Sequence, residues 1–341
     1  MKQLLLTSRI KSMAKKYAKE LFADKRSDFI QPVDGLKNLI IDLQEVNDSL
    51  AEKDSYIKYL ETIILDYPRL KNLNISKFTT CKRKYDKILE ESKLTAKIKY
   101  RSADLPSIRE ERDKLKPVEG VFYEQIVNRM HYKDARLYLA PYMKMLGVQT
   151  CVYCNNSEAV YSDGLDEAYY HFDHWLPKDK YPFLCVCFYN LYPCCSNCNG
   201  HKLDGKKGSF CLYSKNVPVF DPFVFLIDRS ALKNNDAQTL SVLFNARNKV
   251  DNDFRNDYNT VFRIEQFYNS PAKKRTCLQL IKLIDKHKGH YLTATDASVP
   301  GIADKDELWK EVLGVDENEE NIFTDVNKKL KIDTAKDAKL I

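Results

Sequence analysis

The sequence has few of the residues that interrupt helices, and it has no apolar run long enough to cross a membrane. Its 341 residues include only 10 glycines and 12 prolines, which favours a mainly helical protein. No stretch approaches the roughly 20 apolar residues of a membrane-spanning helix, and Leu4–Leu6 is too short for the apolar core of a signal peptide. We therefore expect no membrane span and a cytoplasmic location.

Nucleotide-binding signatures are also missing. The chain has neither a phosphate-binding loop of the Walker A type nor a dinucleotide-binding glycine pattern, and it shows no internal repeat. We therefore expect any dependence on ATP to come from a partner. The 10 cysteines do not indicate a disulfide framework, because such frameworks belong to secreted proteins and no signal peptide is found.

Positive charge is in excess. The chain has 55 Lys and Arg against 48 Asp and Glu, a net charge of +7, and the basic residues occur in blocks. Such blocks favour an anionic partner, although a lysine-rich surface that is only solvated has the same composition. The hydrophobic fraction of 44% is sufficient for a substantial core.

Two C-x-x-C pairs, Cys151–Cys154 and Cys195–Cys198, stand out in the middle of the chain. This spacing is typical of a structural zinc site, because each pair forms a tight turn that presents two sulfurs to a tetrahedral ion. About 15–20 residues separate the pairs of an ordinary zinc ribbon, whereas the gap here is much longer and contains Asp173 and His174. A redox pair is disfavoured, because no thioredoxin-like βαβ pattern surrounds the first C-x-x-C.

Other cysteines lie near these pairs. Cys185, Cys187, Cys194 and Cys211 are interpreted as small buried hydrophobic residues rather than as further ligands. Because Cys194 directly precedes Cys195, the choice of ligand between these two stays open.

Further motifs follow in a fixed order. Asp173-His174 is followed by Pro177, then by Asn190-Leu191, and the second cysteine pair continues as Cys-Asn-x-x-Lys up to Lys202. Over roughly residues 149–210, this order resembles the zinc-stabilised HNH endonucleases, whose core is a ββα-metal finger. The resemblance implies an HNH finger built on a four-cysteine zinc knuckle.

The residue types suit phosphodiester hydrolysis, which is the reaction that the resemblance implies. A neutral histidine serves as a general base near neutral pH, which favours His174. A divalent ion, Mg²⁺ or Mn²⁺, stabilises the leaving oxygen, and its preference for oxygen ligands points to Asp173 and Asn199. The resemblance assigns the catalytic metal to the same two residues. The alternative for His174 is a hydrogen-bonded core histidine.

The resemblance also implies roles for two further residues. Asn190 would hold the loop of the base in shape, and Lys202 would lie close to the phosphate. Many members of the family have His where this chain has Asn199, so His201 is an alternative ligand of the catalytic ion. His171 would share a strand face with Asp173, which favours a structural or groove-lining role.

The regions on both sides of the finger are expected to be mainly helical. In residues 1–105, a heptad pattern predicts one long helix over 36–66 that ends at Pro68, and a basic segment predicts a second helix over 69–101. The apolar seam of the first helix fits an intramolecular hairpin or a homo-oligomer. The second helix is a candidate surface for phosphate contacts.

The remaining boundaries follow from prolines, glycines and the cysteine motif. Residues 106–148 are expected to form a linker and a lead-in helix that stops at Gly147. The finger is assigned to residues 149–215, and residues 216–341 are expected to be mainly helical. The predicted fold class is therefore mainly α with a small α+β insert.

The function that these features favour is metal-dependent cleavage of DNA. The finger and the Phe-Asp-Pro-Phe segment Phe220–Phe223 are similar to HNH nuclease subunits of prokaryotic anti-phage systems of the Septu type, which work with a separate ATPase subunit. A stand-alone restriction-type nuclease and a non-catalytic zinc-binding adaptor for nucleic acid or protein are the alternatives. Asp173-His174 and Asn190 favour the enzyme, because an adaptor needs neither.

Overall fold

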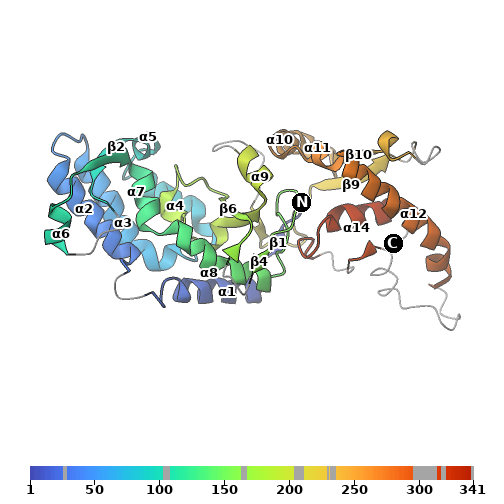
Figure 1. Cartoon of the computed structure of the whole chain (residues 1–341), viewed down its shortest axis with the longest axis horizontal. Coiled ribbons are helices and arrows are strands. Elements are labelled where there is room, and N and C mark those ends of the chain that lie inside the picture. Colours follow the sequence, from blue (N-terminus) through green and yellow to red (C-terminus); the bar gives the residue numbers. More distant parts are fainter. Residues whose placement is uncertain are drawn as a thin grey trace. The chain divides into compact units, whose positions relative to one another are not determined.

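The computed structural model describes residues 1–25, 29–102, 108–162, 167–202, 211–228, 230, 236–294, 313–315 and 320–338, and Figure 1 labels their elements. The chain forms two compact units. Unit 1 comprises residues 1–5, 147–160 and 193–341, and unit 2 comprises residues 6–146 and 161–192. The predicted finger of 149–215 is thus divided between the units, and its residues 203–210 lie outside the described part. Each unit is described in turn.

Unit 2 begins with α1 (Ser8–Glu20), followed by α2 (Pro32–Val46) and α3 (Lys53–Leu70). The single helix predicted over 36–66 is therefore two helices. The break is at Asn47: this buried residue donates to the backbone oxygens of Asp42 and Lys99 and accepts from the Lys99 N–H, so it leaves the helical path. Pro68 lies in the last turn of α3 rather than ending the helix.

The apolar seam is used within the chain. α2 and α3 pack on each other, and four leucines of the heptad pattern are fully buried: Leu36, Leu39, Leu43 and Leu60. This packing agrees with the intramolecular hairpin. A homo-oligomer through this seam would need the same buried side chains.

The single basic helix predicted over 69–101 is also wrong. This segment contains α4 (Phe78–Asp86), α5 (Glu91–Leu94) and strand β2 (Lys97–Tyr100), which pairs antiparallel with β3 (Val118–Val121). Lysines alternate with Ile98 and Tyr100 in β2, and Ile98 is buried while Lys97 and Lys99 are exposed. This alternation with a period of two is typical of a strand. The helix prediction relied on the number of basic residues and did not take the alternation into account.

The lead-in to the first cysteine pair is two helices, α7 (Phe122–Arg129) and α8 (Tyr132–Met145), with the short α6 (Arg109–Asp113) before β3. The break is at His131, which has a left-handed φ of 52°. Gly147, with a φ of 69°, follows α8 where the sequence predicts the stop.

A buried charge cluster ties three of these elements to α2. Asp42 is fully buried, and its carboxylate contacts the guanidinium groups of Arg112 at 2.7 Å, Arg101 at 3.3 Å and Arg129 at 3.5 Å. The side chain of Glu45 adds a second contact to Arg101 at 3.0 Å. Since buried cations are tolerated only when they are paired, Asp42 fixes where the three arginines lie.

The insert between the cysteine pairs contributes residues 161–192 to unit 2. It contains β4 (Tyr161–Ser162), which pairs with β5 (Glu167–Ala168), and β6 (His171–His174), which pairs with β7 (Leu191–Cys194). Only Leu191 and Tyr192 of β7 belong to this unit. Phe183, fully buried in the 3₁₀ turn Pro182–Leu184, stacks on Tyr85 of α4 with ring centroids 3.9 Å apart.

In unit 1, short strands precede a set of helices. β1 (Leu4–Leu5) pairs parallel with β8 (Tyr213–Ser214), and β9 (Phe223–Asp228) pairs antiparallel with β10 (Ser241–Ala246). The cysteine helix α9 (Ser196–His201) lies between β7 and β8 in sequence. The later helices are α10 (Asn252–Phe262), α11 (Ile264–Tyr268), α12 (Pro271–Ala294) and α14 (Lys328–Asp337). The described residues of 216–341 thus contain these four helices together with the β9–β10 pair.

The core of unit 1 is aromatic. Phe223 and Phe225 of β9 pack on Phe244 of β10, and Tyr258 and Tyr268 complete the cluster from α10 and α11. α14 packs on β9, and the Asp333 carboxylate on α14 accepts the Phe225 N–H at 2.9 Å. None of the described helices combines the length and apolarity that crossing a bilayer requires.

The buried charge cluster generates a stability prediction. In Asp42→Asn, three buried guanidinium groups lose their shared counter-charge, and we expect the free energy of unfolding to fall by about 3–5 kcal/mol. The matched control is Asp34→Asn on the same helix, whose exposed pair with Lys37 is worth about 1 kcal/mol or less. Urea denaturation of both variants measures the difference. Equal losses in the two variants would contradict the role of Asp42.

Candidate metal centre and active-site residues

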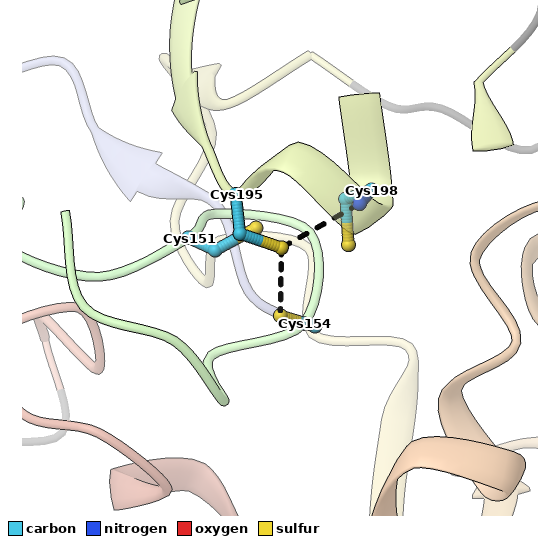
Figure 2. A group of neighbouring side chains, drawn as sticks. All are labelled: Cys151, Cys154, Cys195 and Cys198. Carbon is cyan, nitrogen blue, oxygen red and sulfur yellow. Dashed lines mark hydrogen bonds between the residues drawn. The ribbon is translucent and has the colours of Figure 1, made fainter. Parts of the chain in front are cut away.

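The four cysteines of the two C-x-x-C pairs come together. Their Sγ atoms lie within 4.8 Å of one another, and Figure 2 shows two side chains from the loop of the first pair meeting two from the start of α9. The Sγ atoms of Cys154 and Cys195 are 4.0 Å apart. Four sulfurs around a zinc ion at 2.3 Å would be separated by about 3.8 Å. The donor set therefore fits a structural zinc, and Cys194 lies outside the group.

The first pair sits on a turn fixed by backbone hydrogen bonds. The Cys151 N–H donates to the Ser157 carbonyl at 2.9 Å, and the Val152 N–H donates to the Pro193 carbonyl at 3.1 Å. The Asn156 N–H points to Cys154 Sγ at 3.4 Å. A backbone N–H directed at the sulfur favours the thiolate, which is the form that binds metal.

Asn155, directly after the first pair, fastens this turn to the C-terminal segment. It is fully buried with a left-handed φ of 51°, which Asn tolerates better than most residues. Its Nδ2 donates to Thr150 Oγ1, Ile322 O and Asp325 O at 2.9–3.0 Å, and its Oδ1 accepts the Lys329 N–H at 3.0 Å. Sequence analysis did not find this residue; the Asn following the C-x-x-C motif was the available signal.

Two tyrosines hold the carbonyl groups of the same turn. The Tyr258 hydroxyl donates to the Tyr153 carbonyl at 2.6 Å, and the Tyr268 hydroxyl donates to the Cys154 carbonyl at 2.8 Å. Burial raises the pKa of both tyrosines well above its usual range, so both hydroxyls stay protonated donors. The aromatic core of unit 1 is thus connected directly to the metal-ligating loop.

The second pair is organised by the start of α9. Cys195 is the N-cap residue, and its Sγ accepts the Cys198 N–H at 3.5 Å. Hydrogen bonds from the neighbouring thiols, Cys151 first, hold the pKa of Cys195 below its usual value, whereas burial raises the pKa of Cys151. Cys195 therefore becomes a thiolate more readily than Cys151. A metal ion would displace the remaining thiol protons.

The remaining sequence-predicted residues of unit 1 lie on or just after α9. Asn199 Oδ1 is 3.8 Å from Cys194 Sγ, and the His201 ring is 6.2 Å from the Phe267 ring. Lys202 Nζ lies 5.6 Å from the centre of the Tyr153 ring and donates to its hydroxyl at 3.4 Å. Lys202, predicted to lie near a phosphate, thus contacts Tyr153 in the turn of the first cysteine pair.

Asp173 and His174 are neighbours on β6 in unit 2, on opposite faces of the strand. Asp173 and His171 share the half-buried face, as predicted, while His174 is buried on the other. His174 Nε2 lies 3.0 Å from the Cys185 carbonyl oxygen. Because a carbonyl only accepts, Nε2 carries the proton, and Nδ1 carries the lone pair of the neutral ring.

Asn190 organises the loop that follows His174. It is fully buried; its Oδ1 accepts the Leu176 N–H at 2.8 Å, and its Nδ2 donates to the carbonyls of Leu176 at 3.1 Å and Leu184 at 3.2 Å. Its backbone carbonyl accepts the Trp175 N–H at 2.9 Å. One side chain therefore joins the two ends of the loop after the histidine.

Tyr132, at the start of α8, supports the same strand. Its ring centroid is 4.4 Å from that of His174, and its hydroxyl donates to the Phe172 carbonyl. The sequence gives no signal for Tyr132, because no motif marks a contact between α8 and β6. Within unit 2 the structure thus brings together Asp173, His174, Asn190 and Tyr132, and within unit 1 it brings together the four cysteines.

The cysteine cluster generates a prediction about metal content. Cys154→Ser removes one of four ligands, so we expect the purified protein to lose its equivalent of zinc and to unfold at lower temperature. Cys211→Ser is the matched control, because Cys211 belongs to unit 1 but not to the four-sulfur group. Elemental analysis with thermal unfolding measures both effects. Full zinc retention by Cys154→Ser would disprove the ligand assignment.

Asn155 permits a separate test of side-chain bonding and backbone conformation. Asn155→Gly retains the left-handed conformation but loses the side-chain hydrogen bonds. We expect this variant to lower the free energy of unfolding by about 1–3 kcal/mol. Asn155→Ala adds backbone strain and should lower the free energy of unfolding by about 1 kcal/mol more. Denaturant unfolding with zinc present measures both variants. Wild-type stability in both would show that the bonds contribute nothing.

Comparison with known proteins gives one partial similarity. No protein-family model matches the chain, and no solved structure matches it. Over 90 residues the chain is 39% identical to the Septu protein PtuB of Bacillus thuringiensis, a stretch that covers 25% of this chain and 30% of that protein. The chain therefore spans less than a third of the length of this curated relative.

Proposed function

We propose that the chain is a metal-dependent HNH endonuclease that hydrolyses phosphodiester bonds in DNA and acts in anti-phage defence with a partner subunit. The similarity to the Septu protein PtuB supports the defence role. The buried four-cysteine group supports a structural zinc. Because the sequence has no Walker A loop, any ATPase activity would belong to the partner.

The observation that carries the nuclease assignment is the orientation of His174. Its Nε2 donates to the Cys185 carbonyl at 3.0 Å, so the neutral ring has Nδ1 as its basic nitrogen. In the proposed reaction, Nδ1 accepts a proton from the attacking water. Tyr132 and Asn190 fix the strand and the loop on the two sides of this histidine.

The other site residues have the chemistry that the reaction needs. Asp173 and Asn199 offer oxygen atoms, which suit Mg²⁺ or Mn²⁺, and His201 is the alternative ligand. The ion, when bound, stabilises charge on the leaving oxygen. β6, β7 and α9 follow one another in the chain as strand, strand and helix, which is the order of a ββα finger. Lys202 would contribute positive charge near the phosphate.

The test is cleavage of plasmid and linear DNA by the full chain with Mg²⁺ or Mn²⁺, alone and as the complex purified from its native host. We expect cleavage that EDTA abolishes and that His174→Ala lowers at least about 100-fold, which is the usual contribution of a general base. His171→Ala is the matched control, because His171 lies on the opposite face of the same strand.

Each result separates the alternatives. Cleavage that survives His174→Ala would contradict the assignment of the base and direct attention to His201. Absence of cleavage by both the chain and its native complex, with zinc retained, would identify a zinc-binding adaptor instead. Loss of activity in His171→Ala as well would indicate that the strand, rather than the base, had been disturbed.

A further inference from the structure

Unit 2 has a pocket next to the strand of His174. Its volume is about 570 Å³, and its walls come from β2, α7, the start of α8 and the loop after His174. The lining residues used below are Tyr100, Gln125, Asn128, Tyr132, Arg136 and Lys178. His174 does not line the pocket, but its ring packs against Tyr132, which does.

Two cations lie beside the Tyr132 ring of this pocket. Arg136 Cζ lies 5.9 Å and Lys178 Nζ 5.8 Å from the centre of that ring. With Lys133, three cationic side chains line the pocket, and Asp134 supplies the one carboxylate among the described lining residues. The pocket is therefore electropositive and attracts phosphate groups.

The pocket also offers groups that recognise a nucleobase. Tyr100 and Tyr132 are half-buried, so part of each residue is accessible, and the amide group of the exposed Asn128 both donates and accepts hydrogen bonds. The amide of Gln125 is buried, and its oxygen accepts from Arg129 at 2.8 Å. An unpaired base exposes its ring face and its hydrogen-bonding edge. A base inside a duplex is stacked on its neighbours and exposes neither face.

The geometry points to a binding pocket for an unpaired nucleotide of the DNA strand that His174 attacks, so the substrate is single-stranded at the site of cleavage. This assignment rests on the proposed nuclease function. Two pocket residues lie next to the proposed catalytic residues. The Tyr132 hydroxyl donates to the carbonyl of Phe172, the residue before Asp173, and Lys178 lies on the loop that follows His174. The nucleotide in the pocket is therefore adjacent to the reacting phosphate.

The test measures binding without cleavage. A short fluorescein-labelled single-stranded oligodeoxynucleotide and the corresponding duplex are titrated with the full zinc-containing chain, with Mg²⁺ and Mn²⁺ omitted, and fluorescence anisotropy is recorded. Wild-type protein should bind the single strand at least about fivefold more tightly than the duplex, because only the single strand gains a base–aromatic stack of about 1–3 kcal/mol.

Two variants of Tyr132 separate stacking from hydrogen bonding. Tyr132→Leu removes the ring and should weaken single-strand binding at least about fivefold. Tyr132→Phe retains the ring and loses the hydroxyl that donates to Phe172, so its affinity should stay within about twofold of wild type.

Charge variants test the phosphate contacts. Arg136→Ala and Lys178→Ala should each weaken single-strand binding and reduce the salt dependence of log K by about 0.7, the value for one released phosphate counterion. Lys58→Ala, exposed on α3 and outside the pocket, removes the same charge and should leave both quantities unchanged.

Failure of the pocket and failure of the nuclease are distinguishable. Equal affinity for duplex and single strand, no measurable binding of the single strand, or wild-type binding by Tyr132→Leu would each overturn the pocket assignment. Selective binding by a chain that cleaves nothing in its native complex would leave the pocket in place and disprove the nuclease. Cleavage that needs His174, together with equal binding of single strand and duplex, would support the nuclease and disprove the pocket.

Discussion

Four neighbouring sulfur atoms, three of them on buried cysteines, place the strongest constraint on unit 1. Thiolates so close together repel one another and are costly to bury, unless a cation lies between them. The surrounding groups are arranged around that requirement: backbone N–H groups point at Cys154 and Cys195, and tyrosine hydroxyls hold two carbonyls of the first turn. The aromatic core of unit 1 and the metal site therefore depend on each other.

Unit 2 is stabilised differently, by buried arginines paired with Asp42 and by packed aromatic rings. The insert that carries His174 is held by the Tyr85–Phe183 stack and by a hydrogen bond from the Phe188 N–H to the Lys71 carbonyl. Asn190 then joins the ends of the loop after the histidine. These contacts hold His174 in one orientation, with Nε2 at the Cys185 carbonyl.

Local patterns in the sequence were sufficient for some features and not for others. The cysteine spacing identified four residues that the fold brings together, and Gly147 correctly marked the end of α8. The single helix predicted from the heptad pattern was wrong at Asn47. This residue bonds to Lys99, which lies 52 residues away in a strand that was itself predicted as helix. Asn155 and Tyr132 were missed for the same reason: their partners are 167–174 and 40 residues distant, respectively.

The bonds of Asn155 also affect how the protein is made. During synthesis, all four cysteines leave the ribosome well before residues 322–329, which supply three of the partners of Asn155. A nascent chain can therefore gather its cysteines early, but the Asn155 side chain gains these three partners only after residues 322–329 have been synthesised. An incomplete chain would carry a loosely held metal site, which separates ion capture from the final rigid form of the protein.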